Sequence, residues 1–523
     1  ITETDTMEIT DIPAPGKEFN FAAHIIERNH ARPDKIAFID DHGTLTYGQL
    51  EDGIRRMAGT LCDAGVRREE RVLLLMHDCN DWPVAFLGAM YAGIIPVAVN
   101  TLLTADDYAY MLEDCRATAV FVSEVLRETV SQAMAQAGMQ DLPVFVSGAQ
   151  GELPHGFTSL AGALKTTSPR SEAATTSPDE AGFWLYSSGS TGNPKGTVHT
   201  HGNPYWTAEL YGAGTLGIEE SDTCFSAAKL FFAYGLGNAL SLPLSVGASV
   251  VRMAGRPTPD AVFERWVGQK PTIFFGAPTG YAGMLASPDL PGRDEVALRL
   301  ASSAGEALPA DLGNRFTEHF GIQIIDGIGS TEMLHIYLSN HPDENHYGTS
   351  GRPVPGYGIE LRNDEGKPVG DGEIGDLYVC GPSSALMYWN NREKSRDTFQ
   401  GVWTKSGDKY VRNEDGTYTY SGRSDDMLKV SGIYVSPFEV EATLMQHDAV
   451  LEAAVVGHKD DDGLVKTKAY VVLNEGRQVD DAELKEFVKS RLAPYKYPRL
   501  IDFIDALPKT ATGKIQRFRL RQN

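Results

Sequence analysis

The sequence has few cysteines, and their spacing suits neither a metal site nor a disulfide framework. The five are Cys62, Cys79, Cys115, Cys224 and Cys380, which are far apart and never form a Cys-x-x-Cys pair. An odd, scattered set of this kind argues against the common zinc motifs and favours a reducing compartment. We therefore expect a cytoplasmic protein.

Long apolar runs are also missing. The longest, residues 83–99, is interrupted by Gly88, Gly93 and Pro96 and is shorter than the roughly 20 residues that cross a bilayer. It predicts a buried helix followed by a strand. The polar, acidic start of the chain does not resemble a signal peptide, so we expect no membrane partner.

Positive charge is in short supply. Lysine and arginine number 47 against 70 aspartates and glutamates, which gives a formal net charge of −23. Proteins that bind nucleic acids need a basic surface to displace counterions from the phosphates, so we expect no nucleic-acid partner. A nucleotide ligand is not excluded, because it needs only a local nest of backbone N–H groups and a few cations.

Length and pattern predict an α/β protein of at least two domains. A chain of 523 residues exceeds one ordinary core. Strand-like runs such as residues 71–76 and 94–99 alternate with helix-like runs such as residues 46–65 and 106–115. Glycine-rich turns between residues 351 and 420 predict a β-subdomain. A compact α/β tail follows, with helices expected at 437–446 and 480–492 and strands near 453–457 and 468–473.

The strongest local motif is YSSGSTGNPKG, residues 186–196, directly after a strand-like run. Its glycines allow a tight backbone with inward N–H groups, its hydroxyls add donors, and its lysine adds a cation, so it suits a triphosphate. It does not satisfy the Walker A pattern. The residues predicted to bind ATP here are Ser187, Ser188, Gly189, Ser190, Thr191, Gly192 and Lys195.

Four further strings follow in order. They are IDGIGSTE (325–332), WTKSGD (403–408), GRSDDMLK (422–429) and PKTATGK (508–514). Together with the phosphate loop they resemble the signature motifs of the adenylate-forming enzymes, which include acyl-CoA synthetases, peptide-synthetase adenylation domains and firefly luciferase. The resemblance covers nearly the whole chain. It implies a large N-terminal domain, residues 1–424, with αβαβα-type subdomains plus the β-subdomain, and a small mobile C-terminal α+β domain, residues 425–523.

The resemblance also implies roles for residues of the second and third motifs. Glu332 matches the position that holds Mg²⁺, and Thr331 is expected to hydrogen-bond the α-phosphate. Asp408 matches the aspartate that accepts both ribose hydroxyls, and Arg423 is expected to contact ribose and phosphate. Many members carry an aromatic residue where Ile328 stands. The remaining implied ATP-binding residues are Gly305, Glu306, Asp326, Gly327 and Ile328.

The C-terminal motifs resemble those that carry the second half of the reaction. Lys514 is the implied catalytic lysine, together with Thr331 and Glu332, because it can bring a compact positive charge to the oxygens of the forming anhydride. Asp425 is the implied hinge, and Ser431 and Gly432 are expected at the coenzyme A channel. Acetylation would remove the charge of Lys514, so a lysine acetyltransferase and a deacetylase are implied partners. A homodimer stays open.

The segments that line the acid pocket in this family read AKLFFAYG (228–235), FGAP (275–278) and SAGE (303–306). Aromatic side chains on one wall and small ones on another suit a flat ring better than a long tail. These runs resemble those of the aryl-CoA ligases of the family, and His335 is expected near the ring edge. The predicted pocket residues are Phe232, Ala233, Tyr234, Gly276, Ala277, Ile328, Gly329 and His335.

The expected function is therefore ATP-dependent activation of an aromatic carboxylate and its transfer to coenzyme A. Benzoate is the expected acid, and 4-hydroxybenzoate or another arylcarboxylate remains an alternative. A carrier-protein-loading adenylation domain would share the ATP motifs but not the use of free coenzyme A. An inactive nucleotide-binding regulator would usually have lost Glu332 or Lys514, and both are present.

Overall fold

The computed structural model describes residues 12–187, 193–424, 426–430, 433–459, 465–492, 496–509 and 515–521. The chain forms two compact units, residues 1–359 with 379–405 (unit 1) and residues 360–378 with 406–523 (unit 2). It passes between them inside strands β17 (Gly358–Arg362), β18 (Ile374–Cys380) and β21 (Trp403–Arg412). Part of the expected β-subdomain thus groups with the C-terminal tail. The boundary predicted between residues 424 and 425 lies inside unit 2 and stays a prediction.

The first sheet of unit 1 has eight strands in the order β19-β9-β8-β4-β3-β5-β6-β7. Strand β3 alternates its buried side chains between two cores, as the pleat requires. Leu74 joins the core with helices α2 and α3, whereas Leu73 and Leu75 join the core with α4 and α5. The strands are β3 (Arg71–Leu75), β4 (Ile95–Ala98), β5 (Ala117–Ser123), β6 (Val144–Ser147), β7 (Phe157–Ser159), β8 (Ala181–Ser187), β9 (Lys195–Thr200) and β19 (Met387–Tyr388).

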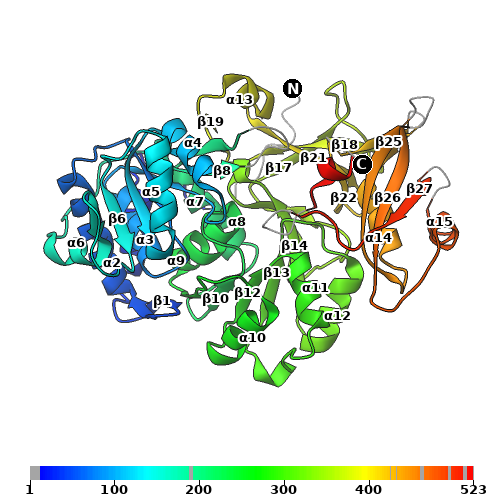
Figure 1. The fold of residues 1–523 in the computed structure, drawn as a ribbon, viewed down its shortest axis with the longest axis horizontal. Helices are drawn as coiled ribbons and strands as arrows, with labels where there is room; N and C mark the ends of the chain where they lie inside the picture. The colour runs from blue at the N-terminus through cyan, green and yellow to red at the C-terminus, as the bar shows by residue number, and fades with distance from the viewer. Residues whose placement is uncertain are drawn as a thin grey trace. The chain divides into compact units, whose positions relative to one another are not determined.

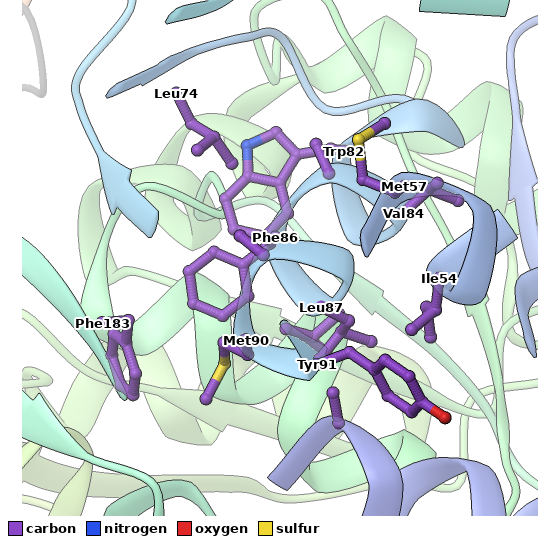
Figure 2. Close-up of a cluster of buried hydrophobic side chains, with 14 of the residues drawn as sticks. Ile54, Met57, Leu74, Trp82, Val84, Phe86, Leu87, Met90, Tyr91 and Phe183 are labelled. Atoms are coloured by element: carbon purple, nitrogen blue, oxygen red, sulfur yellow. The ribbon is translucent and has the colours of Figure 1, made fainter. Parts of the chain in front are cut away.

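Helix α3 (Asp81–Tyr91) is buried around its whole circumference, and it confirms the helix predicted before strand β4. Figure 2 shows it among side chains of the N-terminal core, where the rings of Trp82 and Phe86 stack with centroids 4.9 Å apart. A Cβ at Gly88 would lie 2.5 Å from the Met57 side chain, so glycine permits the close approach to α2. The other helices that contribute to the two cores beside this sheet are α1 (Phe21–Asn29), α2 (Tyr47–Asp63), α4 (Ala105–Cys115), α5 (Arg127–Gln136) and α6 (Leu160–Thr166).

The second sheet of unit 1 has nine strands in the order β16-β15-β14-β13-β12-β10-β11-β1-β2. Helices α10 (Pro259–Gly268), α11 (Pro278–Ala286) and α12 (Ala310–Phe320) lie along it (Figure 1) and share one apolar core with its strands. The strands are β1 (Ile36–Asp40), β2 (Gly43–Thr46), β10 (Thr223–Ser226), β11 (Ser249–Val251), β12 (Ile273–Gly276), β13 (Leu300–Ser303), β14 (Ile324–Gly329), β15 (Ile336–Ser339) and β16 (Arg352–Pro353).

Three short helices and two π-helical turns complete the part of unit 1 that leads into the site. They are α7 (Gly202–Thr207), η2 (Ala208–Ala213), α8 (Ala233–Leu236), η3 (Gly237–Ser241) and α9 (Leu242–Val246). Helix α13 (Arg392–Thr398) and strand β20 (Phe399–Gln400) follow later in the chain. The sequence predicted only β-structure there and missed α13, which is short and highly charged.

Unit 2 contains the predicted α/β tail. Strand β25 pairs antiparallel with β26, which pairs parallel with β27, and helices α14 and α15 share their apolar core. Inside it the buried carboxylate of Glu441 accepts a hydrogen bond from Arg517 at 2.7 Å. The elements are β22 (Tyr418–Arg423), β23 (Leu428–Val430), β24 (Ile433–Val435), α14 (Pro437–Leu444), β25 (Val450–Lys459), β26 (Val465–Leu473), α15 (Asp481–Lys489), β27 (Leu500–Phe503) and α16 (Arg517–Leu520).

Within the described ranges, none of the helices combines the length and the apolar character needed to cross a membrane.

Candidate active site

The nine-stranded sheet has a reversal of strand order at β10, which pairs in parallel with β11 on one side and with β12 on the other. In open α/β sheets, ligands bind outside the carboxyl ends of the strands at such a point. The chain leaves β10 towards residues 228–235 and leaves β12 at Gly276. These are the segments predicted to line the acid pocket, with Phe232, Ala233, Tyr234, Gly276 and Ala277.

The predicted phosphate loop connects two antiparallel strands. Ser187 at the end of β8 pairs with Lys195 at the start of β9, so the two strands form a hairpin, and the lysine lies where β9 begins. Residues Ser188, Gly189, Ser190, Thr191 and Gly192 lie outside the described residues.

The structure brings the end of this hairpin together with the second motif. Strand β19 pairs with β9, with Tyr388 opposite Thr197. The hydroxyl of Tyr388 donates to Oε1 of Glu332 at 2.6 Å, and Nζ of Lys195 lies 4.7 Å from the centroid of the Tyr388 ring. One carboxylate and one ammonium group therefore meet around a single phenol. Tyr388 was not predicted from the sequence, because the residues around it form no motif that indicates a role in the site.

Thr331 begins a short 3₁₀ turn, Thr331–Met333. The carbonyl group of Thr331 is held by a side chain of the eight-stranded sheet. Nε2 of His199 donates to the carbonyl oxygen of Thr331 at 2.8 Å, while Asn203 donates to Nδ1 of the same ring at 2.8 Å. Burial lowers the pKa of His199 to about 4, so the imidazole is neutral. His199 is thus a buried, hydrogen-bonded histidine that positions the turn.

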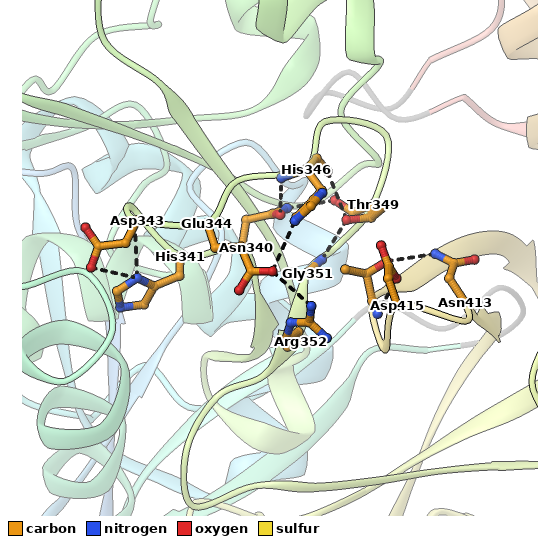
Figure 3. A network of polar contacts seen from close by, with 11 residues as sticks. Asn340, His341, Asp343, Glu344, His346, Thr349, Gly351, Arg352, Asn413 and Asp415 are labelled. Carbon is orange, nitrogen blue, oxygen red and sulfur yellow. Dashed lines mark hydrogen bonds and ion pairs between the residues drawn. The ribbon is translucent and has the colours of Figure 1, made fainter.

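Asp326 lies in the buried part of β14, next to Ser303 on β13. Burial raises the pKa of Asp326 to about 8, so its carboxyl group is largely protonated at neutral pH. Its backbone oxygen accepts from the amide of Asn340 at 2.9 Å, and the side chain of Asn340 donates to the carbonyl of Thr349 at 2.8 Å. Figure 3 shows Asn340 and Thr349 in the polar network of this loop.

Glycines of the second motif are required by close packing of β14 against β15. A Cβ at Gly327 would lie 2.9 Å from the carbonyl oxygen of Leu338, and a Cβ at Gly329 would lie 2.4 Å from that of His335. Neither position admits a side chain without a shift of the backbone. Ile328 lies between them, half-buried.

Gly305 and Glu306 follow β13 at the same edge of the sheet. Gly305 has a φ of 94°, which favours glycine. Oε2 of Glu306 accepts a hydrogen bond from the hydroxyl of Thr279, at the start of α11, at 2.8 Å. This hydrogen bond connects the predicted ATP-binding residues after β13 to helix α11, which follows β12.

His335 lies where the acid pocket was predicted and is buried, with 2% exposure. Its Nε2 faces the carbonyl oxygen of Tyr234 at 3.3 Å and Oδ1 of Asn238 at 3.1 Å, so Nε2 carries the proton. Burial lowers the pKa of His335 to about 3 and keeps the ring neutral. Nδ1 has no hydrogen-bond partner in the described part of the chain.

The wall beside His335 is a buried aromatic and hydroxyl cluster. The hydroxyls of Tyr211 and Tyr234 lie 3.2 Å and 3.1 Å from Oγ of Ser302, and the His335 ring centroid is 5.2 Å from that of Tyr211. Burial raises the pKa of Tyr211 to about 12. Tyr211, Asn238 and Ser302 were missed from the sequence, since only the fold brings them to the predicted pocket.

A methyl group at Gly237 is expected to displace His335. A Cβ there would lie 2.1 Å from Cδ2 of the imidazole, and such overpacking costs about 1–3 kcal/mol. Gly237→Ala should therefore raise the KM for the acid about 10-fold and lower Tm by a few degrees. The control is Gly268→Ala, at an exposed glycine with no atom near its Cβ position. An unchanged acid KM in Gly237→Ala would show that the ring position does not matter for acid binding.

In unit 2, the third motif meets the hinge motif. Asp408 on β21 pairs with Arg423 on β22, and their side chains form an ion pair at 3.0 Å. Arg423 also donates to the carbonyl of Ser406 at 3.3 Å. Two residues predicted to bind the nucleotide are thus brought side by side although 15 positions separate them. The carboxylate of Asp408 is largely buried, which orients it firmly.

The other predicted residues of unit 2 are outside the described ranges. They are Asp425, Ser431, Gly432 and Lys514. Lys509 and Ile515, on either side of the segment with Lys514, form an isolated antiparallel bridge.

Comparison with known proteins places these sites in one family. The model of AMP-binding enzymes matches residues 26–389, and that of the C-terminal domain of AMP-binding enzymes matches residues 439–514. These ranges contain the phosphate hairpin, the second motif and the C-terminal motif.

Individual relatives match almost from end to end. The chain is 54% identical to benzoate–CoA ligase of Thauera aromatica, covering 97% of this chain and 96% of the relative. It is 48% identical to 4-hydroxybenzoate–CoA/benzoate–CoA ligase of Rhodopseudomonas palustris, with 97% and 95% covered. Among solved structures, a benzoate CoA ligase from Burkholderia xenovorans is similar with a TM-score of 0.90, 58% identity, and coverage of 96% of this chain and 100% of that one.

Proposed function

Because the chain belongs to the family of AMP-binding enzymes, we propose that it makes benzoyl-CoA from benzoate, ATP and coenzyme A. It is an AMP-forming aryl-CoA ligase. The observation that supports this most directly is the convergence of Glu332, Tyr388 and Lys195 in the same unit as the buried aromatic cluster around His335. A phosphate site and an aryl site in one unit suit the adenylation of an aromatic acid.

In the first half-reaction, a carboxylate oxygen of benzoate attacks the α-phosphorus of ATP, the bond to the β-phosphate oxygen breaks, and pyrophosphate leaves. Catalysis rests on alignment and on neutralising charge on the phosphoryl oxygens. We assign Lys195 and the backbone of the phosphate loop to the leaving pyrophosphate, and Thr331 to the α-phosphate. Lys514 would stabilise the charge between acid and phosphate.

We assign the nucleotide itself to Asp408, Arg423, Asp326 and Ile328. Asp408 offers an acceptor-only carboxylate for the two ribose hydroxyls, and the ion pair with Arg423 orients it. Asp326 is largely protonated and can donate as well as accept. That suits the edge of adenine, where an amino donor lies beside a ring-nitrogen acceptor. Ile328 would supply an aliphatic face for the base.

Glu332 fits the requirements of Mg²⁺ at the phosphates. Mg²⁺ prefers hard oxygen ligands and is held in such sites by one or two carboxylates plus phosphate oxygens and waters. Tyr388 donates to Oε1 of Glu332 at 2.6 Å and fixes the carboxylate. When bound, the ion would neutralise phosphate charge and orient the leaving pyrophosphate.

In the second half-reaction, the thiol sulfur of coenzyme A attacks the acyl carbon, the bond to AMP breaks, and the thiol proton goes to solvent. We propose that the C-terminal domain, residues 425–523, rotates about Asp425 between the two steps. Ser431 and Gly432 would then border the pantetheine channel. Acetylation of Lys514 would remove its charge and silence the first step reversibly, which would make an acetyltransferase and a deacetylase partners of the enzyme. A homodimer remains a proposal.

A second acid, 4-hydroxybenzoate, is favoured by one feature of the pocket. Nδ1 of His335 is a buried acceptor with no partner among the described residues, and an orphaned buried acceptor costs about 1–3 kcal/mol. A ring hydroxyl can donate to it. The relative from Rhodopseudomonas palustris is named for both acids.

Benzoate is expected to be turned over with far higher kcat/KM than acetate or octanoate. A methyl substituent on the ring should cost about 1–3 kcal/mol by contact with the pocket walls. Pyrophosphate release across a panel of aryl and alkyl acids measures this preference. Product formation with free coenzyme A separates the ligase from a carrier-protein-loading adenylation domain. Preferred turnover of an alkyl acid would contradict the aryl assignment.

A further inference from the structure

The eight-stranded sheet has its own reversal of strand order at β3, and the residues that follow β3 have no part in the reaction described so far. Strand β3 pairs in parallel with β4 and with β5. The chain leaves β3 into residues 76–80, which include Asp78. This aspartate is 4% exposed, and charged side chains so deeply buried are rarely present without a partner.

Asp78 reaches the acid-pocket segment of the other sheet. Its Oδ1 accepts a hydrogen bond from the backbone N–H of Leu230, at a distance of 3.3 Å. Leu230 is the fourth residue after β10 and lies two positions before Phe232. A buried carboxylate at the end of one sheet thus holds the backbone that lines the ligand site at the end of the other.

Two cations, the partly buried Lys229 and the buried Arg252, act electrostatically on the same carboxylate. Nζ of Lys229 donates to the carbonyl of Gly255 at 2.7 Å and to that of Met253. Arg252 donates to the carbonyl of Cys79 at 2.6 Å, and its guanidinium lies 3.7 Å from the centroid of the Phe38 ring. Burial lowers the pKa of both cations, and Asp78 is the first of the groups that oppose this. Each ion is costly in such surroundings without the others.

Hydrogen bonds and close packing within the segment that begins at Lys229 hold its residues in one conformation. The N–H of Phe232 donates to the carbonyl of Lys229 at 3.0 Å, and that of Leu236 donates to the carbonyl of Phe232 at 2.8 Å. A Cβ at Gly235 would lie 2.0 Å from the same Lys229 oxygen. Whatever fixes residues 229 and 230 therefore also fixes Phe232, Ala233 and Tyr234.

We propose that Asp78 and Lys229 are positioning residues for acid binding, which hold residues 229–235 in the shape that receives the aromatic acid. The proposal rests on the proposed function in one respect, that this segment lines the acid site. Neither residue touches the acid. The expected signature is a loss of affinity for the acid with little change in the handling of ATP.

The test compares Asp78→Ala and Asp78→Asn with Asp81→Asn. Asp81 is a second, half-buried carboxyl group after the same strand, but its partner is the hydroxyl of Ser147, at 2.6 Å. In the Asp78 variants the KM for benzoate should rise about 10-fold, while the KM for ATP and kcat stay within about 3-fold. Asp81→Asn should change none of them by more than that.

A double variant provides the rescue. Asp78→Asn removes one of the negative charges that act on Lys229, so the double variant with Lys229→Met should raise the acid KM by less than the product of the two single effects. If the effects multiply, the two side chains act independently and the proposal fails. It also fails if acid and ATP KM rise together, or if active-site titration shows only fewer active molecules with an unchanged acid KM.

Hydrogen exchange separates this proposal from the proposed function. Without any substrate, amides of residues 229–236 should exchange faster in Asp78→Ala than in Asp81→Asn or wild type. Unchanged exchange would overturn the positioning role even if wild type is a benzoate ligase. If wild type fails to release pyrophosphate with benzoate, the proposed function is wrong. The KM comparison is then made with the best acid of the panel, and an unchanged KM for that acid overturns the positioning role.

Discussion

Replacing Lys514 by alanine is expected to slow pyrophosphate release on the order of 10²-fold or more, the effect of losing a positioned charge at a developing oxyanion. Thioester formation should survive at a substantial rate if, as proposed, the small domain rotates between the steps and uses its opposite face for the second one. A paired assay measures both steps. One arm follows ATP-dependent adenylate formation, and the other supplies preformed benzoyl-adenylate and coenzyme A.

The chain offers a matched control on the same segment. Lys509 forms an ion pair with Glu452 and bridges to Ile515 across the residues that contain Lys514. Surface pairs of this kind contribute about 0–1 kcal/mol, so Lys509→Ala should leave both half-reactions within about 5-fold of wild type. If Lys514→Ala slows both half-reactions by one common factor, the lysine is a general structural or binding residue, and the division of labour between the two steps is wrong.

Glu332→Gln is expected to reduce the rate of adenylation on the order of 10²-fold. Glutamine keeps the size of the side chain and an oxygen that can accept from Tyr388, but it removes the charge that suits Mg²⁺. The apparent KM for Mg²⁺ in pyrophosphate release should therefore rise along with the fall in kcat. The measurement is a Mg²⁺ titration at saturating ATP and benzoate.

Tyr388→Phe tests the orientation of the Glu332 carboxylate separately from its negative charge. It deletes the 2.6 Å hydrogen bond to Oε1 of Glu332 and leaves the charge in place. A hydrogen bond to a charged group contributes about 1.5–3 kcal/mol, so a loss of about 10-fold to 100-fold is expected, smaller than that of Glu332→Gln. An unaltered Mg²⁺ dependence in Glu332→Gln would remove the proposed metal role of this residue.

Much of the fold was predictable because its signals are local. Strands β3 and β4 and helices α2, α4, α14 and α15 lie within a few residues of the predicted ranges, since alternating apolar runs and turn residues specify each element from its own neighbours. The motifs could also be recognised in the sequence, because a loop that binds phosphates needs its glycines, hydroxyl groups and lysine within one short segment.

The sequence by itself determined which strings carry the chemistry, the α/β class and the resemblance to the adenylate-forming enzymes. Tertiary structure alone decided which distant side chains support those strings. Three hydrogen bonds join residues that lie 56, 132 and 152 positions apart in the sequence. They link Tyr388 to Glu332, His199 to Thr331, and Asp78 to the backbone of Leu230. Hydrogen bonds act over about 3 Å of space whatever the separation along the chain. No periodicity or spacing in the sequence records such a contact, and only the packing of two sheets creates it.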